Sequence, residues 1–310
     1  MIWYAVTFSL RGPTGTPWQA DTIFGHLCWV LRHRRGEPAL KEFLEPFLAG
    51  KPTFLLSDGF PTDVLPRPLT FGAPYAPSRE GLRQGREVRK QALISREDFL
   101  RALRGEAFMP HPLQKDEIRP TSRVSLKNQI SRLTGTTGQE GQLFTFVEYW
   151  MPRVVIYLKI QEGYEGKVEE LFRWLAEAGY GKRKAVGYGA ISHYDFQPFE
   201  GFPVLQEANA FVSLSPFVPA ASDPSDGRWR IMVKFGRLGE EFALSDNPFK
   251  RPLLMLTAGS VFWDKPVREW YGCMVAGVSP AHPEVVHYGY ALPVPMQLPP
   301  EADVEKERKS

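Results

Sequence analysis

A loop bracketed by two pairs of glycines constrains this chain more than any other segment. It reads Gly179-Tyr-Gly-Lys-Arg-Lys-Ala-Val-Gly-Tyr-Gly189. Three adjacent cations lie between the glycine pairs, namely Lys182, Arg183 and Lys184. Glycines let a backbone approach a ligand closely and adopt positive φ angles, and the planar faces of Tyr180 and Tyr188 suit stacking on bases. We therefore expect a binding site for a nucleic-acid backbone here, in preference to a plain turn between a helix and a strand.

Two other phosphate-binding motifs do not fit this loop. A Walker loop needs Ser or Thr after its Gly-Lys pair, whereas Arg183 follows Lys182 and alanine stands five residues before Gly181. A dinucleotide fingerprint lies between a strand and a helix, whereas this loop follows a predicted helix and precedes a predicted strand. The sequence therefore predicts no nucleotide cofactor.

Composition sets the class of protein. The chain has 310 residues, enough for two domains, and its 43% hydrophobic and 24% charged residues are typical of a globular protein. A net charge of only +3 means that a nucleic-acid surface must be a local patch. Cys28 and Cys273 have no metal-ligand spacing and indicate free thiols in a reducing compartment. With neither an export signal nor a membrane-length apolar run, we expect a cytoplasmic protein and no membrane partner.

Hydrophobic periodicity predicts a split ferredoxin-like pattern, β-α-β, insertion, β-α-β, in residues 1–204. Its predicted strands are 2–10, 53–56, 143–149, 153–160 and 190–196, and its predicted helices are 21–31, 39–48 and 168–178, with Asp21 as a helix cap. Residues 205–298 are expected to form a second, mostly β module, and 299–310 a solvated tail. The fold class is therefore α+β.

The insertion, at about 61–142, is basic and rich in proline and glycine. Between Arg67 and Arg132 it holds 14 basic residues against 7 acidic ones, with one short helix expected to open at Ser95. Such an insertion is either a solvated loop or a functional arm. Together with the basic loop, the charge excess favours an arm that contacts nucleic acid.

Five segments carry a resemblance that spans almost the whole chain in order, namely Trp18–Trp29, Arg119–Asn128, Leu171–Gly189, Lys250–Phe262 and His287–Pro295. They resemble the RAMP superfamily of CRISPR-associated RNA-binding proteins, and within it subunit four of the type III-A (Csm) effector complex. The resemblance implies two RAMP (ferredoxin-like or RRM-like) modules with a basic inserted thumb and a mostly β C-terminal module. Arg119 to Gly138 is the expected thumb hairpin.

The same resemblance implies a non-catalytic subunit of an antiviral ribonucleoprotein. It would grip the repeat-derived 5′ tag of the crRNA and bridge the large polymerase/cyclase-type subunit to the backbone RAMP subunit, with the target RNA nearby. Another interpretation keeps this fold but makes the chain chiefly a protein-interaction adaptor, whose basic loops bind acidic surfaces of its partners.

The expected RNA contacts fall into three groups. In the glycine loop they are Gly179, Gly181, Lys182, Arg183, Lys184, Gly187, Tyr188 and Gly189; at the start of the first helix Trp18, Gln19, Thr22 and His26; in the thumb Arg119, Arg123, Lys127 and Asn128. For Trp18, covering the core is as good an interpretation as stacking on a base. Tyr288 and Tyr290 are interpreted as alternating strand residues.

His26 raises an enzymatic alternative. Related RAMP proteins include metal-independent guide-processing endoribonucleases in which an early histidine is the general acid or base. Such catalysis needs a second group at the scissile phosphate, for example Lys182 or a tyrosine. A hydrogen-bonding or packed histidine is the favoured interpretation, and the other histidines show no metal-ligand spacing. We therefore predict no catalytic residue and no metal.

Overall fold

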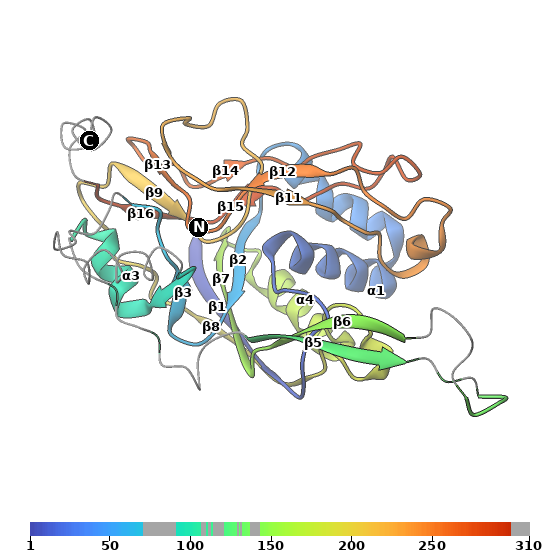
Figure 1. Ribbon diagram of the computed structural model, residues 1–310. Coiled ribbons are helices and arrows are strands. Elements are labelled where there is room, and N and C mark those ends of the chain that lie inside the picture. The colour runs from blue at the N-terminus through green and yellow to red at the C-terminus, as the bar shows by residue number, and fades with distance from the viewer. Residues whose placement is uncertain are drawn as a thin grey trace.

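A four-stranded antiparallel sheet forms the centre of the N-terminal half (Figure 1). The computed structural model describes residues 1–70, 91–106, 110, 113, 121–128, 130, 132–136 and 143–298. The sheet has the order β8-β1-β7-β2, and its strands are β1 (Ile2–Leu10), β2 (Phe54–Phe60), β7 (Arg153–Ile160) and β8 (Ile191–Pro198). Helix α1 (Ala20–Leu48) joins β1 to β2, and α4 (Glu165–Ala178) joins β7 to β8. This is ferredoxin-like connectivity, and the predicted sheet strands and helices are found.

Helix α1 consists of two segments. Gly36 breaks it with φ 83° and ψ 176°, in the left-handed φ range that glycine tolerates. The break follows a basic stretch, Arg32 to Arg35, and precedes Pro38. The two predicted helical segments are therefore confirmed, and they join at an abrupt bend.

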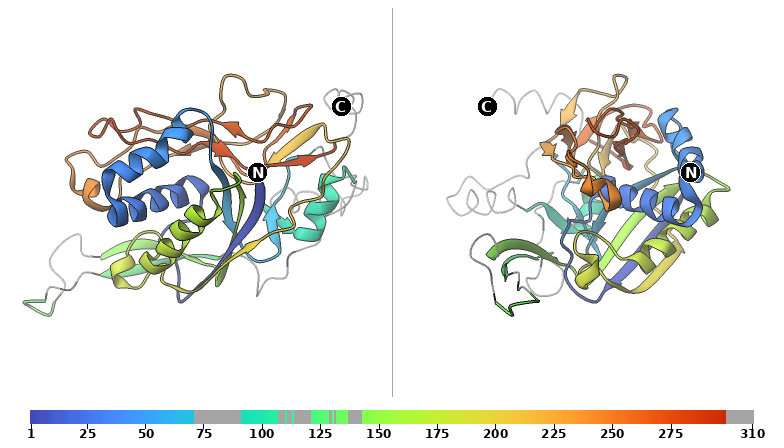
Figure 2. Two further views of the ribbon diagram at one scale, coloured as in Figure 1. Left: turned by 180° about the vertical axis from the view of Figure 1, so that it is seen from behind. Right: turned by 90° about the vertical axis from the view of Figure 1, so that its right-hand side faces the viewer.

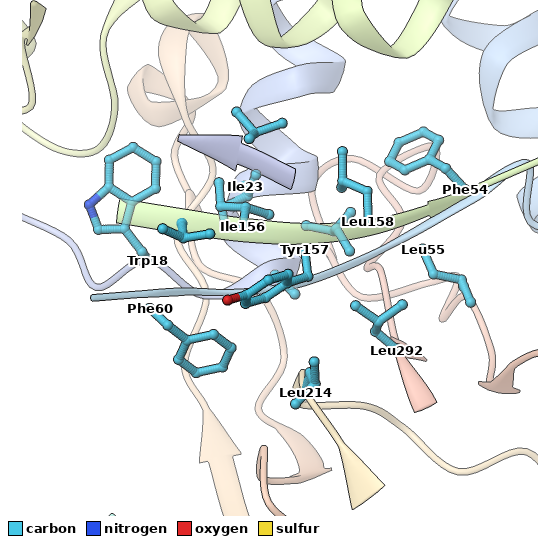
Figure 3. Packing of buried hydrophobic residues seen from close by; sticks show 14 of the residues in the cluster. Trp18, Ile23, Phe54, Leu55, Phe60, Ile156, Tyr157, Leu158, Leu214 and Leu292 are labelled. Atoms are coloured by element: carbon cyan, nitrogen blue, oxygen red, sulfur yellow. The ribbon is translucent and has the colours of Figure 1, made fainter. Parts of the chain in front are cut away.

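Both faces of the central sheet are buried. Along β7 the residues Val154, Val155, Ile156, Tyr157 and Leu158 are all at most 9% exposed. Figure 3 shows Ile156 and Leu158 on the Ile23 side of β7, whereas Tyr157 lies on the opposite side, as do Leu214 and Leu292 of the C-terminal half. A strand buried on both faces gives a continuous apolar run in place of an alternating pattern. The helices therefore cover one face and the C-terminal half covers the other.

The C-terminal half is built from short strands. A four-stranded sheet has the order β10-β13-β9-β16, and two ribbons, β11-β12 and β14-β15, lie beside it. The strands are β9 (Ala210–Ser213), β10 (Gly227–Arg228), β11 (Ile231–Lys234), β12 (Leu253–Leu256), β13 (Val261–Trp263), β14 (Tyr271–Gly272), β15 (Tyr290–Ala291) and β16 (Pro293–Met296). The expectation of a mostly β half is met; the 3-10 turn Glu240–Leu244 lies between β11 and β12.

The two halves share one hydrophobic cluster. Tyr288 stacks on Phe24 with ring centroids 4.6 Å apart, and the Tyr290 hydroxyl donates a 2.6 Å hydrogen bond to the carbonyl of Phe47. Both tyrosines are at most 2% exposed. Tyr290 begins β15, as predicted, whereas Tyr288 lies outside any strand, two residues before it. The boundary at 204/205 remains a prediction, and the core continues across it.

Part of the predicted insertion is described. It contains the short pair β3 (Val64–Pro66) and β4 (Leu93–Ser95), and α3 (Arg96–Leu103). The Ser95 hydroxyl caps α3 by accepting a hydrogen bond from the Asp98 amide, as its sequence predicts. Then β5 (Thr121–Asn128) pairs antiparallel with β6 (Leu143–Trp150), and this hairpin projects from the body in Figures 1 and 2. The segment predicted as the thumb, 119–138, contains β5 but not its partner β6, and its role as a thumb remains a prediction.

No helix in the described part of the chain combines the length and apolar character needed to cross a membrane.

The first turn of α1 is held by side chains from elsewhere. Asp21 does not cap the helix, contrary to the prediction. The Asp58 carboxylate, carried on β2, instead accepts a 2.8 Å hydrogen bond from the Ala20 amide. Lys234 of β11 places its ammonium 2.8 Å from the Asp21 carboxylate, and it also donates to Gln19 and Thr22. This buried ion pair ties the C-terminal half to α1.

Replacing Lys234 by Met should destabilise the fold by about 3 kcal/mol, because it leaves the Asp21 carboxylate, with a side chain only 4% exposed, without its ammonium partner. The double variant Lys234→Met/Asp21→Asn should recover much of this loss. The measurement is the free energy of unfolding in denaturant for both single variants and the double. Strictly additive effects would mean that the pair carries no coupling.

Candidate nucleic-acid interface

The glycine loop is closed on itself and on the first loop of the chain. It leaves α4 at Gly179, and the Tyr180 amide donates a 3.0 Å hydrogen bond to the Gly189 carbonyl. The Gly189 amide in turn donates to Pro13, 2.9 Å away. A Cβ at position 189 would lie 1.8 Å from the Tyr180 carbonyl oxygen, so only glycine fits there. The glycines thus permit contacts between backbone segments of this chain.

Two aromatic rings expected at the surface lie inside. Trp18 stacks on Tyr180 with ring centroids 3.7 Å apart and an interplanar angle of 12°. They are 4% and 0% exposed, and the Tyr180 hydroxyl donates to the Pro17 carbonyl. Burial also raises the pKa of Tyr180 well above its usual value. Neither ring is presented for stacking on a base in this structure, and of the two interpretations of Trp18 its burial favours the core-covering one.

The three consecutive cations have three different environments. Lys182 is exposed, and the described residues offer its ammonium no ion-pair partner. Arg183, also exposed, lies over the rings of Phe144 and Phe146, at 5.0 and 5.2 Å from their centroids. The Lys184 ammonium lies 3.0 Å from the Glu240 carboxylate. Only the first of the three is therefore presented to solvent without a described partner group.

The hairpin is joined to the glycine loop through a buried carboxylate. Glu148 of β6 accepts hydrogen bonds from Ser125, from Lys127 and from the hydroxyl of Tyr188. These donors, Lys127 first, lower the pKa of Glu148 to about 2. Lys127 and Tyr188, both expected to contact RNA, are therefore partners of this carboxylate in the structure.

The other predicted hairpin residues are more open. Arg123 and Asn128 are exposed on β5. Arg119 lies outside the described residues. The first loop reaches the same junction, because Thr14 pairs with Tyr149 and Gly15 lies against Phe146 and the Lys182 backbone. The hairpin, the first loop and the glycine loop therefore meet at one place.

The polar residues at the start of α1 are engaged with protein groups. Gln19 and Thr22 accept hydrogen bonds from Lys234. The His26 Nε2 atom accepts a 3.2 Å hydrogen bond from the Gly181 amide. Desolvation, with a smaller effect of Lys184, lowers the pKa of His26 to about 4, so the ring is neutral at pH 7. In this structure His26 supports the backbone of the glycine loop.

Sequence reasoning missed Phe144, Phe146, Glu148 and Glu240. The first three alternate on β6, so they share one face of the hairpin. That alternation was the available signal. Glu240 is 56 residues from its partner Lys184, and no local pattern relates the two.

Among the residues that the structure describes, no three His, Cys, Asp or Glu side chains gather in a way that would hold a metal ion.

Comparison with known proteins establishes the fold. No family model matches the chain, and no curated protein matches it. A chain of a Csm1-Csm4 cassette solved with pppApA is 19% identical, with a TM-score of 0.64, over 96% of this chain and 99% of that one. A chain of a Csm3-Csm4 subcomplex in the type III-A CRISPR-Cas interference complex is 12% identical, with a TM-score of 0.58, over 97% of this chain and 100% of that one. The resemblance drawn from the sequence is confirmed at the level of the fold.

Substituting Gly189 by Ala should destabilise the protein by about 3 kcal/mol or more, because the new Cβ overlaps the Tyr180 carbonyl and φ is +63°. Gly187→Ala is the matched control: φ is +91°, but the space is open. It should cost only about 1 kcal/mol. Chemical denaturation measures the free energy of unfolding of both variants. Equal losses in Gly189→Ala and Gly187→Ala would show that residue 189 does not pack tightly against the Tyr180 carbonyl.

Stability should fall as pH drops from about 6.5 to about 4. The folded state holds His26 with a lowered pKa of about 4, so unfolding takes up a proton in this window. The contribution amounts to at most about 3 kcal/mol. His26→Gln should flatten the fall only in part, because burial also lowers the pKa of His287 to about 4. Unfolding free energies between pH 4 and 7 test this, with exposed His193→Gln as the control; an unchanged slope in His26→Gln would contradict it.

Proposed function

We propose that this chain is the non-catalytic RNA-binding subunit of a type III-A CRISPR effector complex and that it grips the repeat-derived 5′ tag of the crRNA. The observation that carries the proposal is its structural match, over 96–97% of its length, to chains of Csm1-Csm4 and Csm3-Csm4 assemblies. The basic glycine loop and the projecting hairpin meet at one place on that fold, which adds a surface suited to a single RNA strand.

The proposed RNA path begins at the glycine loop. Lys182, whose ammonium has no ion-pair partner among the described residues, would bind one phosphate, and the exposed Arg183 would bind a second. Arg123, near the base of β5 and on the same face as Lys127, extends the polar surface, and Asn128 adds a polar group on the opposite face at the far end of β5. Lys127 forms an ion pair with Glu148, and Tyr188 donates a hydrogen bond to it. In this proposal both residues therefore hold the hairpin against the glycine loop. In this proposal the residues at the start of α1 contact protein groups and hold the glycine loop in place; they are Trp18, Gln19, Thr22 and His26.

Two exposed apolar surfaces support assembly with protein partners. The outer face of the hairpin carries Val124 and Leu126, both 65% exposed. The β11-β12 ribbon carries Ile231, Val233 and Leu254, which are 63%, 46% and 65% exposed. Exposed apolar surfaces of this kind mark interaction sites. We infer partners equivalent to those in the solved assemblies: a large polymerase/cyclase-type subunit and a backbone RAMP subunit, with the target RNA nearby.

The alternative is a guide-processing endoribonuclease that uses His26. General acid-base catalysis needs an imidazole nitrogen within reach of the scissile phosphate. The Nε2 atom of His26 instead accepts the Gly181 amide, and its low pKa leaves it a weak base at pH 7. We therefore assign it a supporting role and retain the enzyme as an outcome of the test.

Purified chain should bind labelled repeat-spacer RNA only when the tag is present, and it should leave the RNA intact in EDTA. Lys182→Ala should weaken binding and reduce the salt slope by about 0.7, the value for one single-strand phosphate contact. Lys51→Ala, an exposed cation beyond the other end of α1, should change neither quantity. Binding measured across a salt series tests both statements.

Three other outcomes would overturn the proposal. A discrete cut that is lost in His26→Ala would make the chain an endoribonuclease. Binding that ignores the tag would favour the protein-adaptor interpretation. An unchanged salt slope in Lys182→Ala would make the glycine loop structural only.

A further inference from the structure

We propose that the Glu240 carboxylate occupies a phosphate position beside the glycine loop, and that single-stranded RNA replaces it with one of its own phosphates on Lys184. The chain would then carry a built-in competitor for its own ligand. This inference rests on the proposed RNA-binding function. It adds that the Glu240 carboxylate lowers the affinity for single-stranded RNA.

The contact has the geometry of a phosphate contact. The Lys184 ammonium lies 3.0 Å from a Glu240 carboxylate oxygen, a normal distance for an ammonium and an anionic oxygen. The side chains of Lys184 and Glu240 are 29% and 34% exposed, so solvent reaches both. The pair lies two residues from the exposed ammonium of Lys182. In this proposal the RNA backbone held at Lys182 continues towards Lys184 and places a neighbouring phosphate on its ammonium.

The ionised form of the carboxylate fits this role. Burial raises the pKa of Glu240, but the hydrogen bond and the charge of Lys184 outweigh this effect, and the net pKa lies below the usual value. Glu240 therefore carries a negative charge at neutral pH, as a phosphate does.

The segment that carries Glu240 has its own anchors. Glu241 forms an ion pair with Arg32 of α1. Phe242 stacks on His282 with centroids 4.1 Å apart, and it meets the ring of Trp29 edge-on at 5.3 Å. Because these contacts hold the 3-10 turn Glu240–Leu244 in place, the Lys184 pair is free to exchange without unfolding the segment.

Glu240 itself is held in an uncommon backbone conformation. Its φ is +49°, in the left-handed region that a residue with a side chain adopts only at a cost. The anchored neighbours therefore hold the backbone of residue 240 beside the loop, so a displaced carboxylate stays near Lys184. A carboxylate held in this way repels an approaching phosphate even after Lys184 has changed partner.

Magnitudes favour the exchange. A solvent-accessible ion pair contributes about 0.2–1 kcal/mol. A phosphate on the same ammonium also releases condensed counterions from the RNA, which favours binding at moderate salt. RNA can therefore displace Glu240, although the competition lowers its affinity.

The test compares two variants that remove the same charge from the same turn. Glu240→Gln should bind tagged single-stranded RNA about three- to fivefold more tightly, the factor that corresponds to loss of one accessible ion pair. Its salt slope should be steeper by up to about 0.7, because in the wild type the displaced Glu240 carboxylate stays beside the phosphate and retains a cation that RNA binding would otherwise release. Glu241→Gln, whose carboxylate pairs with Arg32, should change affinity by less than about twofold because the remaining long-range effect is screened by salt. Lys184→Ala in the Glu240→Gln background should abolish the gain.

The outcomes separate this inference from the proposed function. Wild-type protein that binds tagged RNA, with Glu240→Gln no tighter than Glu241→Gln, would overturn the inference and leave the function standing. No RNA binding by any variant would overturn the proposed function itself. Thermal melts of both glutamine variants serve as the folding control, since a loss of structure in Glu240→Gln would mean that Glu240 is a structural ion-pair partner and not an exchangeable one.

Discussion

The central sheet is buried on both faces, and the rest of the structure depends on this constraint. Helices α1 and α4 cover one face, and only the C-terminal half can cover the other. The two halves are joined by apolar contacts, such as the stack of Tyr288 on Phe24, and by polar ones, such as the Lys234–Asp21 ion pair. The first turn of α1 becomes a fixed base for the glycine loop, because His26 of that helix accepts the Gly181 amide.

On this base the cations differ in availability although they are adjacent in sequence. Arg183 lies on two phenylalanine rings, Lys184 faces a carboxylate, and Lys182 remains in solvent. A planar guanidinium stacks on aromatic faces better than an ammonium does, so the order Lys-Arg-Lys suits three separate tasks. Charge on the loop therefore holds the hairpin and the C-terminal half in place as well as offering a surface to an anion.

Much of the fold could be predicted from the sequence, and less of the site. Periodicity located α4 and the strands of the central sheet because each buries a regular apolar pattern, and Ser95 was identified because capping is local. The pairing of β6 with β5 was missed, since an alternating strand does not reveal its partner. Trp18 was ambiguous because a tryptophan at a helix start suits both a core and a rim. Glu240 was missed because its partner Lys184 is distant in sequence, and ion pairing across a fold leaves no local signal.

The shared core has a consequence for how the chain is made. Strands β15 and β16, which flank Leu292 beside Leu55 in Figure 3, are the last described strands to leave the ribosome. Until about residue 296 has emerged, the central sheet has one apolar face without its final cover. Domains that fold early during synthesis need a complete core, and this N-terminal half lacks one. Its apolar face is thus exposed to chaperones and to aggregation from the time β8 emerges, at about residue 198, until about residue 296.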